Sequence, residues 1–215
     1  KTVSGGELIT ILDENHQALK GASLWIGEQR YDCNDKGHTL VPFSNNPGER
    51  NAVIQDPTGF ATMARFFQSK EAYNLTAGMH LDQEALRSGG TARILIRPTL
   101  TLAGETVSLK QIESASLHLH SLNLDGIPAT TSVENFKLAS DRESFHEFRV
   151  PDRLTRLTAT LRVKIKAASQ GGKEIEISSS RVFRVSDFLR SDKVGDLYLS
   201  KIDGRHRIEF LGRNG

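Results

Sequence analysis

The sequence predicts an all-β fold, with two antiparallel β-sandwich domains in tandem. Apolar and polar residues alternate one by one along several segments, which is the pattern of strands with one face in a core. Glycine, proline, asparagine and aspartate separate these segments at short intervals, as they do in antiparallel sandwiches. Helical periodicity is scarce, which argues against a parallel sheet covered by helices.

The first part of the chain contains four segments of strand character, each followed by polar or turn-forming residues. These segments are 8–12, 23–26, 51–54 and 61–67. The turn after the third one carries Asp56 and Gly59. A further turn is expected at Gly37, because Asn34 and Asp35 stabilise such a turn by side-chain-to-backbone hydrogen bonds.

The clearest strand of the second part is 157–167, where six apolar residues alternate with Thr, Arg and Lys. Gly171 and Gly172 then predict a hairpin turn into a strand over 173–177. Lys and Arg on the first strand would face Glu on the second, and each such pair contributes a few tenths of a kcal/mol. Shorter strands are expected over 92–97, which ends at Pro98, and over 117–120.

One short helix is expected over 82–88. Asp82 would cap its start and Gly89 would end it. The segment 111–114 is expected to form another short turn. Neither segment is long enough to form a layer of the fold.

We divide the chain into a small domain over 1–70, a larger one over 71–200 and a final piece over 201–215. The polar stretch 68–72 marks the first boundary. The final piece is either the last strand of the second domain or the start of a further module, because 207–215 repeats the pattern of 7–15, an apolar strand that runs into a polar turn with Asn. We therefore expect the chain to be a segment of a longer protein.

The composition narrows the classes of partner. The net charge is +2, and residues 151–215 carry 14 Lys or Arg against 8 Asp or Glu. This basic excess fits the solvent face of a strand, or a surface that steers an acidic partner. Nucleic acid is not expected as a partner, because no zinc-finger or RNA-binding signature is present. A single cysteine rules out an internal disulfide, and no apolar run is long enough to span a membrane.

Residues 8–43 carry a recurring pattern: a strand, an acidic turn, a second strand, Asp32 to Gly37, and a strand containing Pro42. This pattern resembles prealbumin-like and macroglobulin-like β-sandwich modules of the alpha-2-macroglobulin family. The resemblance implies tandem immunoglobulin-like or macroglobulin-like sandwiches in a large extracellular or cell-surface protein. No thioester sequence is present, so the covalent chemistry of that family is not implied here.

Two clusters are candidates for an ion or partner patch. His118 and His120 lie on one face of a predicted strand, where both could reach one metal ion if Glu113 or Asp125 supplied a third ligand. The alternative is a solvated strand face.

The second cluster, 141–147, contains Asp141, Arg142, Glu143, His146 and Glu147. Paired carboxylates can perform acid–base chemistry in a cleft. Here they precede the predicted strand over 148–151, and a charged loop with its own ion pairs is the simpler interpretation.

No catalytic constellation or cofactor site is found in the sequence. Cys33 lies between Asp32 and Asp35, which would raise its pKa and oppose its use as a nucleophile. We expect a non-enzymatic structural or interaction segment that presents or spaces neighbouring domains of the same parent chain, with a protein or glycan partner. The alternative is a binding module for a glycan or a divalent cation.

Overall fold

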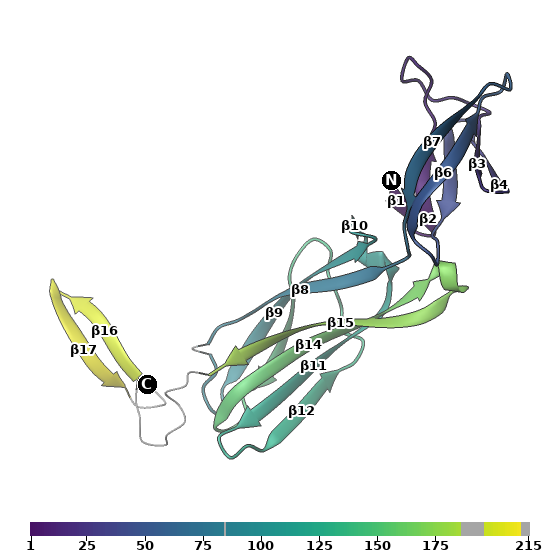
Figure 1. Cartoon of the computed structure of the whole chain (residues 1–215). Coiled ribbons are helices and arrows are strands. Elements are labelled where there is room, and N and C mark those ends of the chain that lie inside the picture. The colour runs from purple at the N-terminus through teal and green to yellow at the C-terminus, as the bar shows by residue number, and fades with distance from the viewer. Residues whose placement is uncertain (84, 186–195, 212–215) are drawn as a thin grey trace. The chain divides into compact units, whose positions relative to one another are not determined.

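The computed structural model describes residues 1–83, 85–185 and 196–211 (Figure 1). Their regular elements are strands and two short 3₁₀ helices, so the all-β prediction is confirmed. The first seven strands are β1 (Thr2–Val3), β2 (Gly6–Thr10), β3 (Ser23–Ile26), β4 (Gln29–Asp32), β5 (His38–Pro42), β6 (Gly48–Gln55) and β7 (Ala61–Gln68). The middle strands are β8 (Tyr73–Leu81), β9 (Thr91–Leu102), β10 (Glu105–Val107), β11 (Ile112–Asn123) and β12 (Pro128–Val133). The remaining strands are β13 (Ser144–Arg149), β14 (Leu154–Ala167), β15 (Lys173–Arg184), β16 (Asp196–Ile202) and β17 (Arg205–Leu211).

The chain forms two compact units. The first comprises Lys1–Asn74, Leu100–Gln111 and Ile165–Ile175. The second comprises Leu75–Thr99, Ile112–Lys164 and Glu176–Gly215. Each unit combines segments that are separate in the sequence.

The first unit contains a sheet with strand order β1-β2-β5 and another with order β4-β3-β6-β7. All neighbouring strands in these two sheets pair antiparallel. The buried core consists of Ile11, Ala22, Leu24, Val41 and Ala52. Gly6 is required at the start of β2, because a Cβ there would lie only 2.2 Å from the carbonyl oxygen of Val41.

The turns of the first unit form where the sequence predicts them. The Asp56 carboxylate accepts hydrogen bonds from the N–H groups of Thr58 and Phe60, and Gly59 has a φ of 94°. These contacts, led by the bond from the Thr58 hydroxyl, lower the pKa of Asp56. The Asn34 side chain likewise accepts from the Lys36 and His38 N–H groups and holds the turn around Gly37.

The second unit has two facing layers. One is the sheet β12-β11-β14-β15, drawn as neighbouring arrows in Figure 1, and the other contains β8, β9 and β13. The alternation over 157–167 is confirmed within β14, because Leu157, Ala159, Leu161, Val163, Ile165 and Ala167 are all buried. The hairpin turn at Gly171 and Gly172 leads into β15 as expected. Across this hairpin the Arg162 guanidinium lies 3.6 Å from the Glu176 carboxylate.

Strand β9 continues through Pro98, where the sequence predicted its end. On one side of β9 the pairing with β13 stops at Ile96, and the pairing with β10 starts at Leu100. Pro98 therefore lies between two ladders, where its missing N–H costs little on that side.

The helix predicted over 82–88 does not form; the described residues of this segment make turns. Backbone hydrogen bonds pin the end of the segment instead, since Gly89 donates to Val150 and Val150 donates to Gly90. A helix this short gains little from its own hydrogen bonds, so tertiary contacts decide its conformation. At 111–114, the short 3₁₀ helix Leu109–Gln111 precedes β11.

Strands β16 and β17 form a hairpin whose turn is Asp203-Gly204. Ile202 pairs with Arg205 across this turn, as Val3 pairs with Gly6 across the turn of the first hairpin. Both hairpins thus have a two-residue turn, but the pattern match between 207–215 and 7–15 does not extend to their register, because Glu7 is the second residue of β2 and Arg207 is the third of β17. Residues 212–215 lie outside the described part. The assignment of 201–215 to a further module stays a prediction.

None of the helices among the described residues has the length and apolarity needed to cross a lipid bilayer.

Candidate functional site

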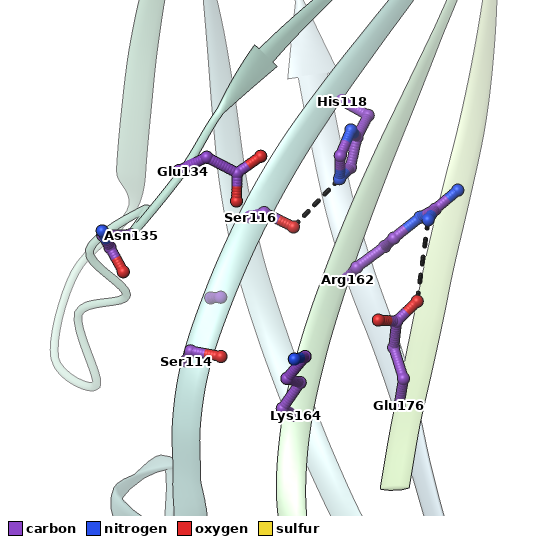
Figure 2. A pocket seen from close by; sticks show the side chains of 9 residues that line it. Ser114, Ser116, His118, Glu134, Asn135, Arg162, Lys164 and Glu176 are labelled. Carbon is purple, nitrogen blue, oxygen red and sulfur yellow. Dashed lines mark hydrogen bonds and ion pairs between the residues drawn. The ribbon is translucent and has the colours of Figure 1, made fainter.

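A polar hollow of about 260 Å³ lies on the outer face of the four-stranded sheet of the second unit (Figure 2). Its side chains come from three neighbouring strands and the turn after β12. The lining residues are Ser114, Ala115, Ser116, His118, Glu134, Asn135, Arg162, Lys164 and Glu176. Ser114, Ser116 and His118 share this face because alternate residues of β11 point to the same side.

The His118 ring is held by a hydroxyl at each nitrogen. Nε2 lies 3.0 Å from the Ser116 hydroxyl oxygen, and Nδ1 lies 2.8 Å from that of Ser132, which is paired with His118 on β12. His120 has a similar contact, since its Nδ1 lies 3.0 Å from the Thr130 hydroxyl oxygen. These imidazoles are therefore engaged within the sheet.

The rest of the hollow mixes charges of both signs. Figure 2 shows the Arg162 guanidinium directed toward Glu176, at 3.6 Å, and both side chains are about half exposed. The described lining residues include hydroxyl, amide, carboxylate, imidazole and cationic groups, but no Phe, Tyr or Trp ring. Such a surface can hydrogen-bond a polar ligand and offers no stacking platform for a sugar.

The two histidines do not assemble a metal site with a third ligand. Among residues 1–83, 85–185 and 196–211, no group of three or more His, Cys, Asp or Glu side chains is arranged to hold a metal ion. Asp125, one of the two residues proposed as third ligand, lies 3.1 Å from the Arg153 guanidinium.

The acidic cluster 141–147 is partly a strand, because β13 begins at Ser144. Glu147 and Glu143 lie on the outer face of the sheet and form ion pairs with arginines of β9. The Arg93 Nε donates to Glu147 at 3.0 Å, and Arg97 lies 3.1 Å from Glu143. The strand starts earlier than the sequence predicted because its backbone pairs with β9 from Ser144, opposite Ile96, onward; the exposed ion pairs lie beside this ladder.

The cluster does not come together at one place. Asp141 and Arg142 are exposed residues that precede β13. Along β13, His146 points to the opposite face from Glu147, because neighbouring residues of a strand alternate. His146 and Glu147 therefore point to opposite faces of β13, although both line the hollow described next.

His146 instead lines a second hollow, of about 280 Å³, between β13 and the four-stranded sheet. The other lining residues are Leu119, Ser121, Thr131, Glu147, Phe148, Arg149, Pro151 and Leu157. Sequence reasoning missed this hollow, although Ser144, His146 and Phe148 do alternate with exposed residues. The missing information was the pairing of strands, which places Thr131 and Leu157 opposite this face.

Cys33 is half-buried in the first unit. Burial raises the pKa of its thiol, and the neighbouring Asp32 charge raises it further. The raised pKa agrees with the expected direction, but burial, which the sequence did not indicate, is its main cause, and Asp32 alone of the two aspartates contributes.

Comparisons with known proteins place these features in a family. Residues 82–193 match the family model described as AbpF third immunoglobulin-like domain. The chain is 25% identical over 222 residues to "Actin-binding protein F" of Dictyostelium discoideum; the match covers 98% of this chain and 9% of that protein. A tetra-tandem repeat from the extending region of a large adhesion protein shares 16% identity, with 83% of this chain and 43% of that chain covered and a TM-score of 0.26.

These comparisons do not show the resemblance to macroglobulin-like modules. The family match covers more than half of the chain and spans β9 to β15. The chain therefore belongs to the family of AbpF third immunoglobulin-like domains.

Proposed function

We propose that the chain is a non-enzymatic structural or interaction segment of a larger multidomain protein, where it presents or spaces neighbouring domains. The observation that carries the proposal is the match to a relative of which this chain spans only 9%. A module of this size within a long protein acts through its neighbours and its surface.

The state of the candidate groups supports a non-catalytic role. Glu143 and Glu147 are paired with arginines, and the ring nitrogens of His118 are hydrogen-bonded to serines. A general acid or base has to exchange a proton with a bound substrate, whereas these groups are bonded to other side chains of the sheet. Chromogenic ester, phosphate and glycoside substrates should show no turnover. Turnover that is lost in Glu143→Gln or His146→Ala would overturn the proposal.

Filamentous actin is the first partner to test, because the relative named above is called an actin-binding protein. Co-sedimentation of the purified chain with actin filaments, against a control without filaments, separates two versions of the role. Saturable pelleting of the chain with filaments would mean that the chain contacts actin directly. If a folded chain does not pellet, its role would be to space neighbouring domains.

The alternative function is a binding module for a glycan or a divalent cation at the polar hollow around His118. The hydroxyl and carboxylate groups of that hollow favour a small polar ligand. Thermal shift against calcium, zinc and a set of oligosaccharides tests it, since a ligand at a hundredfold excess over Kd stabilises the fold by about 2.7 kcal/mol. A shift abolished by Ser116→Ala would favour this alternative.

We also propose an extracellular or cell-surface location. It is supported by Asn74-Leu75-Thr76, a glycosylation triplet whose Asn74 is exposed on β8. Secretion from a eukaryotic host, followed by glycosidase treatment, should reveal a mass shift that Asn74→Gln removes. An unmodified secreted chain would withdraw this support.

A further inference from the structure

The two layers of the second unit differ in width. The layer with β8, β9 and β13 has three strands within this unit, and the facing sheet β12-β11-β14-β15 has four. At one margin the layers are linked, because the Ala77 N–H of β8 donates to the Ser179 hydroxyl of β15 at 3.0 Å. At the other margin β12 has no strand opposite it among the described residues, and the outer edge of β13 has no strand beside it.

The inner face of β12 is consequently uncovered. Thr131 and Ala129 pair with Leu119 and Ser121, so their side chains point to the same face as these two buried residues. Thr131 and Ala129 are nevertheless exposed. Residues on an inner face become exposed when the opposing layer stops short of them, and here the opposing layer stops at β13.

The second hollow lies where the missing strand would be. Its apolar lining is Leu119, Leu157, Phe148 and Pro151, and it opens beside Thr131 of β12. Leu119 and Leu157 are already buried, so an apolar side chain inserted here would be removed from water itself and would cover the half-buried Phe148. The free N–H and C=O groups along the edge of β13 can meanwhile pair with an extended backbone.

The unused polar groups of this hollow favour a carboxylate. His146 is half-buried, and within the described part of the chain its ring forms no hydrogen bond or ion pair; the same holds for the Arg149 side chain on the rim. Glu147, the one acidic residue of the lining, is already bonded to Arg93. The groups left to recognise a ligand are therefore the His146 imidazole and the Thr131 hydroxyl, which can each donate a hydrogen bond, and the Arg149 cation, which favours a carboxylate.

We propose that the edge of β13 accepts an extended segment of a partner protein as a fourth strand. Alternate residues of that segment would enter the hollow, one of them apolar, and a carboxylate would reach His146 and Arg149. If the segment paired with the edge of β12 instead, the hollow would stay empty and Thr131 would stay exposed. The edge of β13 is therefore favoured. The proposal rests on the role of the chain as an interaction segment and names the surface and the chemistry of its partner.

The test uses the full chain and a phage-displayed library of peptides about eight residues long, which is enough to span β13. Selected peptides are synthesised, and their Kd is measured by fluorescence anisotropy. We expect alternating apolar residues with at least one Asp or Glu. Thr131→Trp fills the mouth of the hollow and should weaken binding about tenfold or more. Thr130→Trp is the matched control, because it lies on the outer face of the same exposed strand, and its Kd should stay within about twofold.

Two further readouts decide the site and the chemistry. Hydrogen exchange should show new protection of β13 amides in the presence of the peptide. The double variant His146→Ala with Arg149→Ala should reduce the preference for Asp over Asn in the peptide about tenfold. Circular dichroism confirms that each variant is folded.

The proposal is overturned if no selected peptide distinguishes Thr131→Trp from Thr130→Trp, or if the protection falls on β12. It is also overturned if the chain dimerises through this edge, since the occupant would then be a second copy. Failure of the proposed non-enzymatic role would appear separately, as turnover in the substrate panel.

Discussion

At the scale of single residues, Glu71 is the most consequential buried charge of the first unit. Its side chain accepts hydrogen bonds from the Ala168 and Ser169 N–H groups, at 2.9 and 2.6 Å, and from the Tyr73 hydroxyl at 3.2 Å. Burial alone would raise the pKa of Glu71, but the bonds from Ser169, Ala168 and Tyr73 outweigh it and lower the pKa. Burial and the Glu71 charge together raise the pKa of Tyr73 to about 12. Glu71 thus ties the chain before β8 to the turn after β14.

We expect Glu71→Gln to lower the free energy of unfolding by about 1–3 kcal/mol at neutral pH, because the amide offers one acceptor where the carboxylate offers two. Since the folded pKa is lowered, the stabilising contribution of Glu71 is complete above pH ~4.3, the usual value for Glu. It is lost as the pH falls through the lower folded pKa. Urea unfolding of both proteins across this range measures the difference.

The control for this prediction is Glu28→Gln, at an exposed position in the turn after β3. Its stability should follow wild type within about 0.5 kcal/mol at all pH values tested. An equal loss in both variants would show that net charge, rather than the hydrogen bonds to Glu71, is responsible.

At the scale of elements, the sequence predicts best the strands whose partners are local. The span 157–167 carries an uninterrupted alternation, and all of it lies in β14. Strands that depend on distant partners were predicted less well. β13 begins early because its backbone pairs with β9 from Ser144 onward, and β9 continues past Pro98 because the ladders with β13 and β10 leave that position unpaired on their side.

The candidate sites follow the same rule. The shared face of His118 and His120 follows from strand periodicity, and the structure agrees. The residues that complete the hollow, such as Ser132 and Arg162, come from strands whose register a sequence pattern does not specify. The strand character of a short charged segment such as 141–147 is also hard to recognise. Charged residues on the outer face of a strand look like loop residues in the sequence, so the alternation of inner and outer residues is not apparent.

The ion pairs between β9 and β13 belong to this scale, and we expect them to contribute little to stability. Arg93 and Glu147 face each other in register, with side chains 57% and 49% exposed. A pair this exposed is screened by solvent, so Glu147→Gln should cost about 1 kcal/mol or less, and less still at high salt. A double-mutant cycle with Arg93→Met, followed by chemical denaturation, measures the coupling. A loss above about 2 kcal/mol would mean that the pair holds β13 in place.

At the scale of the whole molecule, the hairpins β1–β2 and β16–β17 both close with a two-residue turn but lie in different surroundings. In the first, β2 pairs with β1 on one side and with β5 on the other. In the second, β17 pairs with β16, and no further strand of the described chain joins either of them. The side chains of Leu197, Leu199 and Ile208 are 60%, 67% and 69% exposed. A two-stranded hairpin with its apolar residues in water is marginally stable at best.

We therefore expect the amides of β17 to exchange with solvent about a hundredfold or more faster than those of β2, because local stability follows buried contacts. Hydrogen exchange followed by mass spectrometry measures both hairpins in one sample, and β2 is the internal control since it also follows a two-residue turn. This experiment bears on the prediction that 201–215 starts a further module. In such a module a third strand would pair with β17, as β5 pairs with β2, and would raise the protection of the β17 amides to the level of β2. Equal protection in this chain by itself would contradict the expectation, since the described partners of β17 do not bury its apolar side chains.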